Sequence, residues 1–266
     1  MSVYPQVDVG VFGGTGFYDL LEDARTVKIH TPYGAPSSAP LVGMVGDKKV
    51  AFLPRHGTDH SIPPHKINYR ANLWAMKELG ATRIIAPCAC GTLQADVKPG
   101  DFVVLDQFVD RTCCRKDTFY DGPRVTHVSS ADPYCDDLRA LAIKSCENLS
   151  IPFHPTGTVV VIQGPRFSTR AESRWFASQG WEVINMTQYP EAYLARELEI
   201  CYCGIALITD YDAGVDADES VTNVDVMKVF AENLDKLKAL LVDMIPEVTQ
   251  TRDACSCKEA LLYSEM

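Results

Sequence analysis

The stretch Ile200-Cys-Tyr-Cys-Gly-Ile-Ala-Leu-Ile-Thr-Asp-Tyr-Asp212 decides the fold class of this chain. It is uncharged until Asp210 and Asp212, which are separated by one residue. An apolar run of this length that ends in polar residues predicts a strand buried on both faces of a sheet. In open α/β sheets, ligands bind just outside the carboxyl ends of such strands. We therefore expect the two carboxylates to face a small polar ligand.

Segments typical of strands and of helices alternate along the rest of the chain. Short apolar runs predict strands, and apolar residues that recur every three or four positions predict helices. We expect strands at 7–12, 49–54, 84–92, 102–105, 158–162 and 183–184, and helices at 65–79, 136–149, 171–179, 191–198 and from Asn223 onward. This alternation predicts an α/β fold with a largely buried sheet. We expect one domain over 1–250 and a tail over 251–266.

Two further segments carry specific expectations. Asn223 is expected to cap the last helix, and the stripe that begins with Met227, Phe230 and Leu234 is expected to be ordinary core. Residues 110–135 contain several turn signals and predict a long loop. A loop of that length in a compact domain is usually functional or packed against a partner.

Composition excludes several classes of partner. The chain has 266 residues, 46% of them hydrophobic, and a net charge of −10. Non-specific binding to nucleic acid or to an anionic membrane needs a basic surface, so neither is expected. The first ten residues lack the basic start and apolar core of a signal peptide. No apolar run approaches the roughly 20 residues that span a bilayer. We expect a cytoplasmic protein.

The ends of the other predicted strands also carry groups that could bind a ligand. Arginine offers a planar fork to an oxyanion, hydroxyls and backbone amides can complete the site, and carboxylates can hold N–H groups or pass a proton. This set suits group transfer between phosphate and a nitrogen base, although each residue alone could be structural. The residues are Thr15 in a Gly-Gly-Thr-Gly turn, Arg55-His56, Cys88-Ala89 and Thr187. The glycine turn lacks the third glycine of a dinucleotide fingerprint, which argues against a Rossmann dehydrogenase.

A series of motifs resembles the purine nucleoside phosphorylase and methylthioadenosine phosphorylase family. They occur in the family's order and span Val9 to about Pro246: Gly-Gly-Thr-Gly16, Arg55-His-Gly-x-x-His60, His65-Lys-Ile-Asn-Tyr-Arg-Ala-Asn72, Cys90-Gly-Thr-Leu93, Phe119-Tyr-Asp-Gly122, Gly164-Pro-Arg-Phe-Ser-Thr-Arg-Ala-Glu172, Asn185-Met-Thr187 and Thr209-Asp-Tyr-Asp212. The resemblance implies a single α/β domain around a twisted mixed sheet, assembled as a homotrimer or a dimer of trimers.

The resemblance also implies roles for individual residues. Phosphate would be held by Thr15, Arg55, His56, Cys88, Ala89 and Thr187. The nucleoside would be bound by Ser168, Met186, Asp210, Tyr211, Asp212, Val226, Met227 and, from a neighbouring subunit, His127, with Ser168 and Asn223 influencing substrate choice. Cys88 departs from the family, which usually has serine, threonine or asparagine there. Since a thiol is a weaker donor than a hydroxyl, one phosphate contact could pass to the Ala89 backbone N–H.

The family mechanism needs no metal or organic cofactor, because phosphate is a co-substrate. Phosphate attacks the anomeric carbon as the purine leaves, and Asp210 would act as the protonated acid at N7. A carboxylate suits the N6 amino donor of adenine better than the O6 acceptor of hypoxanthine, which favours methylthioadenosine over inosine. The alternatives are a phosphorylase of broad or 6-oxopurine specificity and a non-enzymatic module that binds adenine nucleosides.

Ten cysteines are many for a cytosolic chain, yet none forms a Cys-x-x-Cys pair. One-residue spacing within a strand predicts small buried hydrophobes rather than metal ligands. In the tail, Cys255 and Cys257 resemble a Cys-x-Cys tail of some archaeal relatives, where it takes part in disulfides. A bridge across one residue would be strained, so we expect free thiols and no metal site.

Overall fold

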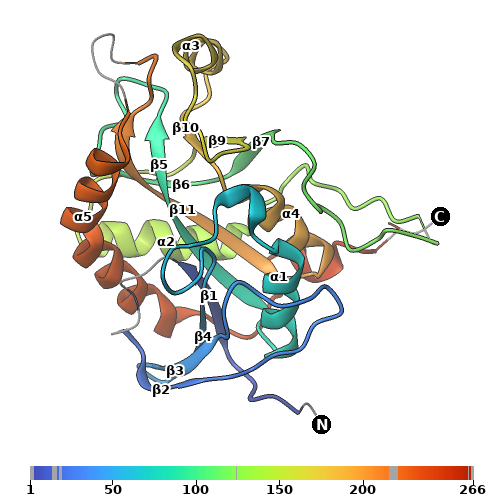
Figure 1. Ribbon diagram of the computed structural model, residues 1–266. Helices are drawn as coiled ribbons and strands as arrows, with labels where there is room; N and C mark the ends of the chain where they lie inside the picture. The colour runs from blue at the N-terminus through green and yellow to red at the C-terminus, as the bar shows by residue number, and fades with distance from the viewer. Residues whose placement is uncertain are drawn as a thin grey trace.

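The computed structural model describes residues 3–13, 17, 20–123, 125–215, 221–262 and 264 (Figure 1). The strands are β1 Val9–Gly13, β2 Glu22–Thr26, β3 Leu41–Val45, β4 Lys48–Pro54, β5 Arg83–Thr92, β6 Phe102–Val104, β7 Gln107–Arg111, β8 Phe153–His154, β9 Thr158–Ile162, β10 Val183–Asn185 and β11 Cys201–Tyr211. The α-helices are α1 Tyr69–Glu78, α2 Asp136–Asn148, α3 Arg170–Ser178, α4 Gln188–Glu197 and α5 Asn223–Met244. Short 3-10 helices are η2 Pro64–Lys66, η3 Ile245–Glu247 and η4 Ser256–Glu259. Among these described residues, no helix combines the length and apolar character needed to cross a bilayer.

All of these strands join in one mixed sheet, so the predicted α/β class is confirmed. The parallel pair β5 and β11 forms its centre, and β1 and β4 run parallel to β5 on one side. β10 is antiparallel to the end of β5, which brings Asn185 beside the last residues of that strand. Because β4, β5 and β11 point the same way, their carboxyl ends meet at one edge of the sheet.

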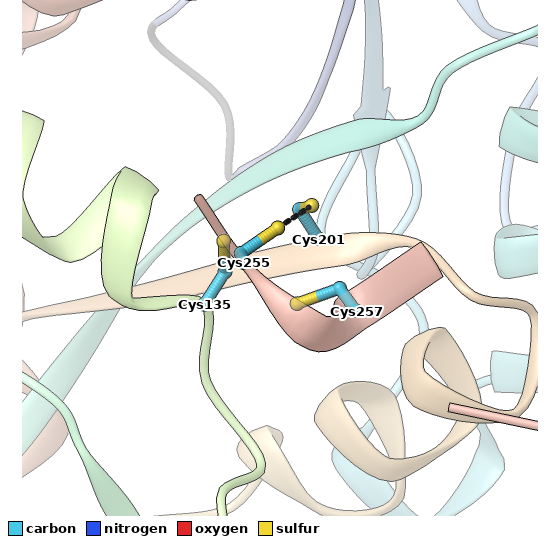
Figure 2. Close-up of side chains that lie close together, drawn as sticks. All are labelled: Cys135, Cys201, Cys255 and Cys257. Carbon is cyan, nitrogen blue, oxygen red and sulfur yellow. Dashed lines mark hydrogen bonds between the residues drawn. The ribbon is translucent and has the colours of Figure 1, made fainter. Parts of the chain in front are cut away.

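The C-terminal tail returns to the opposite end of β11. Beyond α5, η4 places Cys255 and Cys257 beside Cys201, the first residue of β11, and Cys135, which directly precedes α2 (Figure 2). All ten cysteines are free, as expected.

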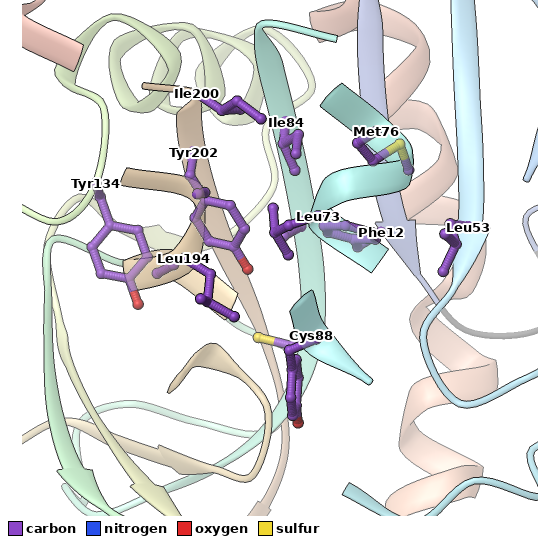
Figure 3. Close-up of a cluster of buried hydrophobic side chains, with 14 of the residues drawn as sticks. Phe12, Leu53, Leu73, Met76, Ile84, Cys88, Tyr134, Leu194, Ile200 and Tyr202 are labelled. Atoms are coloured by element: carbon purple, nitrogen blue, oxygen red, sulfur yellow. The ribbon is translucent and has the colours of Figure 1, made fainter. Parts of the chain in front are cut away.

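Two hydrophobic clusters cover the two faces of the sheet, because successive strand residues point to opposite sides. Ile84 and Tyr202 pack with α1 and α4 on one face (Figure 3). Ile85 and Cys203 pack with α2 and α5 on the other. The expected strand at Ile200–Asp212 is confirmed: residues 201–209 are buried throughout.

Three local predictions were wrong in detail. The first helix begins at Tyr69 rather than at 65, because Asn68 caps it by accepting from the Ala71 N–H. Thr222, not Asn223, caps α5, because its hydroxyl accepts from the Asp225 N–H. The apolar stripe of α5 is core only toward its end, since Met227 is 48% exposed.

The remaining differences concern edges and a loop. The strands β2, β3, β7 and β8 were not predicted; β2 is exposed throughout and so lacks an apolar signal. The long loop predicted over 110–135 is confirmed except at its start, where residues 110 and 111 belong to β7; its described residues between 112 and 134 contain no helix or strand.

Candidate active site

A cavity of about 760 Å³ lies where β4, β5 and β11 end. Most of the residues singled out from the sequence line it together, although they come from distant parts of the chain. They are Arg55, His56, Cys88, Ala89, Ser168, Met186, Thr187, Asp210, Asp212, Asn223, Val226 and Met227.

Three of the expected residues are placed differently. Thr15 lies outside the described residues. Tyr211 is next to two lining residues but does not line the cavity, because alternate residues of a strand face opposite ways. His127 is exposed away from the cavity, and its backbone N–H donates to the Ser264 carbonyl at 2.8 Å.

One end of the cavity is acidic. Asp210, near the end of β11, and Asp212, directly after the strand, both line the cavity, as their spacing predicted. The Thr209 hydroxyl donates to Asp210 Oδ1 at 2.7 Å, and the Ser168 hydroxyl donates to Asp212 Oδ1 at 2.7 Å. Burial, reinforced by the charge of Asp212, raises the pKa of Asp210 to about 6. This carboxyl group can therefore hold or release a proton near neutral pH.

Gly91 makes room for this acid. β11 has a bulge at Thr209, so that Ile208 pairs with Cys90 and Asp210 pairs with Gly91. A Cβ on Gly91 would lie 2.8 Å from Asp210 Oδ2 and 3.2 Å from Ile184 Cγ2. Only glycine leaves the Asp210 carboxylate where it is.

The other end of the cavity carries a buried cation, Arg55. Its Nε and Nη2 donate to the two Glu191 carboxylate oxygens at 3.0 and 2.7 Å, and its Nη1 donates to the Pro87 carbonyl at 3.0 Å. Burial alone would lower the pKa of Arg55, but the Glu191 carboxylate raises it above its usual value, so the guanidinium stays charged. Among the described residues, three of its five N–H groups have partners, which leaves two for an anion.

His56 lies next to this cation as a neutral ring. Its Nδ1 is 2.9 Å from the Ile62 carbonyl, and the ring stacks on His60 with centroids 4.6 Å apart. Burial, together with the charge of Arg55, lowers the pKa of His56 to about 4. A neutral ring must carry its proton on Nδ1 to bond a carbonyl, so Nε2 is an acceptor.

Cys88 has amide partners on its sulfur. The side-chain amides of Asn185 and Gln188 point their N–H groups at Sγ from 3.5 and 3.4 Å. The neighbouring Cys90 thiol, at 3.6 Å, is the main cause that lowers the pKa of Cys88, and burial opposes it. The Cys88 S–H is 3.7 Å from the Ile205 carbonyl. The thiol is thus engaged within the protein rather than held ready for a ligand.

The sequence reasoning missed two residues that shape this site. Glu191, fully buried, fixes Arg55 and also accepts from the Tyr202 hydroxyl at 2.7 Å. Arg115, in the long loop, donates to the Met186 carbonyl at 2.9 Å and the Gln163 carbonyl at 3.0 Å, and also to the Tyr189 carbonyl. A glutamate within a helical pattern and a lone arginine in a loop carry no local signal for such roles.

Comparisons with known proteins agree with this geometry. The sequence profile of the phosphorylase superfamily matches residues 8–246. The S-methyl-5′-thioadenosine phosphorylase of Thermofilum pendens is 52% identical, with 96% of this chain and 97% of that protein covered. The purine nucleoside phosphorylase of Streptomyces coelicolor is 48% identical, with 96% of this chain and 95% of that protein covered.

Solved structures show the same similarity. A methylthioadenosine phosphorylase from an antarctic soil metagenomic library superposes with a TM-score of 0.93 at 36% identity, with 98% of this chain and 93% of that chain covered. The methylthioadenosine phosphorylase from Schistosoma mansoni, solved with adenine, superposes with a TM-score of 0.90 at 37% identity, with 98% and 99% covered.

Proposed function

Because this chain belongs to the phosphorylase superfamily, we propose that it cleaves S-methyl-5′-thioadenosine with phosphate, giving adenine and 5-methylthioribose 1-phosphate. One observation supports this most directly: a single cavity has a buried cation at one end and a pair of carboxyl groups at the other. The cation suits phosphate, and the carboxyl groups suit a purine with N–H donors.

In this proposal, phosphate binds at the Arg55 end. The two remaining N–H groups of Arg55 donate to phosphate oxygens, and His56 Nε2 accepts from a protonated phosphate oxygen. The Ala89 backbone N–H and the Thr187 hydroxyl complete the cradle, with Thr15 joining from the glycine turn. Because the Cys88 thiol is engaged by Asn185 and Gln188, Ala89 takes the contact that other family members make at that position.

The reaction then needs two bond changes. A phosphate oxygen forms a bond to the anomeric carbon as its bond to purine N9 breaks, while the cationic sugar is stabilised by the phosphate charge. Asp210, whose pKa burial raises to about 6, delivers a proton to N7 of the leaving base from its protonated form. Met186 lies against the ribose. Phosphate is the co-substrate, and this sequence of steps uses no cofactor.

Adenine is preferred because of what the acidic end can accept. The Ser168 hydroxyl already holds the Asp212 carboxylate in place by a hydrogen bond. The Asp212 and Ser168 oxygens can therefore both accept from the N6 amino group. An O6 atom facing a carboxylate would leave mismatched acceptors in a buried site, which costs about 1–3 kcal/mol.

The part of the cavity lined by α5 suits the methylthio group. Val226, Met227 and Phe230 of this helix line the cavity. Apolar and thioether side chains suit a methylthio group, whereas a 5′-hydroxyl needs a hydrogen-bond partner. Asn223 lies at the same helix end and is proposed to influence substrate choice. The second candidate is a purine nucleoside phosphorylase of broad or 6-oxopurine specificity, and the 48% identity to a purine nucleoside phosphorylase favours it.

The proposed assembly is a homotrimer or a dimer of trimers in the cytoplasm. His127 is exposed and lies outside its own chain's cavity, which fits a role at the 5′ end of a neighbour's nucleoside. Residues 1–250 would form the catalytic domain, and 251–266 the appended tail.

An assay of base release tests the function. Methylthioadenosine, adenosine and inosine are each incubated with the enzyme, with and without phosphate, and the free base is quantified. We expect release only with phosphate and the highest kcat/KM for methylthioadenosine. Nucleoside binding without phosphate-dependent release would instead support the binding module, and a preference for inosine would support the second candidate.

The Gly91→Ala variant tests the position of Asp210. The added Cβ would lie 2.8 Å from Asp210 Oδ2, so the carboxyl group must move, and a displacement of about 1 Å at a reacting group can cost about 10²-fold in rate. We expect kcat to fall on that scale. In an Asp210→Asn background, the same glycine change should add little, because the two act on one group. Equal losses in both backgrounds would argue against this positioning role.

A further inference from the structure

Four cysteine sulfurs converge at the end of β11 that is remote from the cavity. Cys135, Cys201, Cys255 and Cys257 come from three separate segments, and their Sγ atoms all lie within 4.8 Å of one another. Figure 2 shows the four side chains pointing toward a common centre. None of them lines the cavity. Asp210 is nine positions along the extended strand from Cys201, a distance of about 30 Å.

The backbone holds each of these cysteines in place. The Cys135 N–H donates to the Tyr202 carbonyl at 2.9 Å, and the Cys201 N–H donates to the Thr82 carbonyl at 3.0 Å. Cys255 and Cys257 flank the start of η4, which turns the tail back on itself. Cys135, Cys201 and Cys257 are buried, and Cys255 is half-buried. The sulfurs are therefore preorganised by regular structure rather than by chance approach on a surface.

We propose that these four thiolates bind one tetrahedral divalent cation, with zinc the expected ion. Tetrathiolate sites are typical of structural zinc, and Zn–S bonds of about 2.3 Å place neighbouring sulfurs about 3.8 Å apart. The Cys201 and Cys255 sulfurs are already 3.5 Å apart, and the 4.8 Å limit on the other pairs requires only small movements. Four S–H groups release their protons to solvent as four Zn–S bonds form.

The spacing of the sulfurs fits an ion better than disulfides. A disulfide brings two sulfurs to about 2.0 Å and imposes a fixed torsion on that pair alone. Here each sulfur has the other three within 4.8 Å, which is the arrangement that one central ion requires. A Cys255–Cys257 bridge would close a small strained ring, whereas both residues can bind the same ion from one turn of η4.

Arg83 supplies a positive charge next to the four sulfurs and hydrogen bonds to the tail. Four thiolates around one divalent ion carry a net negative charge, and the Arg83 Nη1 is 4.0 Å from Cys135 Sγ. The same guanidinium donates from Nε to the Thr249 carbonyl at 3.1 Å and also to the Thr251 carbonyl. Arg83 thus offsets the charge and holds the chain that leads into Cys255. Outer partners of this kind orient the ligands of a metal site.

The ion's role would be structural. It would fasten the tail to the starts of α2 and β11. The fastened tail continues to Ser264, whose carbonyl accepts from the His127 N–H, so the ion would also order the loop that carries His127. The proposal does not depend on the chemistry at the cavity.

Metal content and cobalt spectra of the full chain test this site. The protein is produced with zinc in the medium and purified under reducing, oxygen-free conditions. Elemental analysis is expected to give one zinc per chain, and titration of the chelated protein with Co²⁺ is expected to give the absorption bands of tetrahedral tetrathiolate cobalt. All ten cysteines should react with a thiol reagent after chelation and denaturation. Substoichiometric zinc, cobalt spectra without thiolate bands, or missing thiols that indicate disulfides would each overturn the proposal.

A ligand variant and a matched control locate the ion. The Cys255→Ser/Cys257→Ser variant removes two ligands, and its zinc affinity in a chelator competition should fall by about 100-fold or more, since loss of an outer partner alone costs about 10–100-fold. Cys146→Ser changes another buried cysteine, on α2 but outside the cluster, and should keep its zinc. Full zinc binding by the double variant would contradict the assignment. Because metal is measured independently of base release, failure here leaves the proposed enzymatic activity untouched.

Discussion

The Asp210→Asn variant is expected to lower kcat for methylthioadenosine by about 10²–10⁴-fold, the usual contribution of a general acid. The substitution keeps the size of the side chain and its hydrogen bond with Thr209, but an amide has no proton to give to N7. Steady-state release of adenine at saturating phosphate measures the effect. Asp235→Asn changes an exposed carboxylate on α5 and should leave kcat unchanged.

The same variant should change the choice of base. An amide can donate to O6 at any pH, whereas the Asp210 carboxyl can do so only in its protonated form. The penalty on inosine is therefore relieved, and the ratio of kcat/KM values should move toward inosine by about 5–150-fold, equivalent to about 1–3 kcal/mol. An unaltered ratio would show that Asp210 does not determine the choice of base, and Ser168 and Asp212 would then be the candidates for that role.

The pH profile provides an independent test of the acid role. Since the pKa of Asp210 is raised to about 6, the carboxyl group is protonated below that pH and ionised above it. If the protonated form is the active one, kcat/KM for the nucleoside falls as the pH rises through about 6. That falling limb should be absent in Asp210→Asn. A limb of the same midpoint in the variant would assign the titration to another group.

Glu191→Ala is expected to destabilise the protein by about 3–5 kcal/mol, because it leaves a buried arginine without its partner. The side chains of Arg55 and Glu191 are only 3% and 0% exposed, so water cannot replace the lost carboxylate. Denaturant unfolding at a fixed protein concentration measures the change. Glu247→Ala, which removes one member of the exposed pair with Lys144 at 3.9 Å, should cost only about 0–1 kcal/mol.

Glu191→Gln separates the positioning of Arg55 from folding. The amide keeps the shape of the carboxyl group and can still accept from Arg55, so the loss of stability should be smaller than for alanine. However, a glutamine has only one acceptor oxygen, so it cannot accept both Arg55 hydrogen bonds as Glu191 does. The Arg55 guanidinium should then be less firmly oriented, and its remaining N–H groups should be less well aligned with phosphate. We expect KM for phosphate to rise more than KM for the nucleoside. Equal changes in both would indicate a general structural defect.

The outcome of the sequence predictions follows from the range of the interactions involved. The strand at 200–212 was predicted correctly because its apolar run is a local signal, and the placement of Asp210 and Asp212 on one face follows from the two-residue period of a strand. The start of α1 was misplaced because apolar spacing continues through residues before Asn68, whereas the cap is a single hydrogen bond. The apolar stripe of α5 predicts core over its whole length, because periodicity indicates an apolar face but not what covers that face.

The sequence by itself determined the α/β class, the polar strand ends and, through ordered motifs, the family to which the chain belongs. Only the tertiary structure decided which residues meet across the sheet. Glu191 reaches Arg55 over 136 positions of sequence, and four cysteines from three segments share one centre. Local sequence patterns indicate the secondary structure of a segment, whereas these contacts depend on the order of the strands in the sheet and on the path of the connecting segments. The physical reason is that a buried charge or thiol interacts with the groups that are near it in space, and spacing along the sequence does not determine which groups those are.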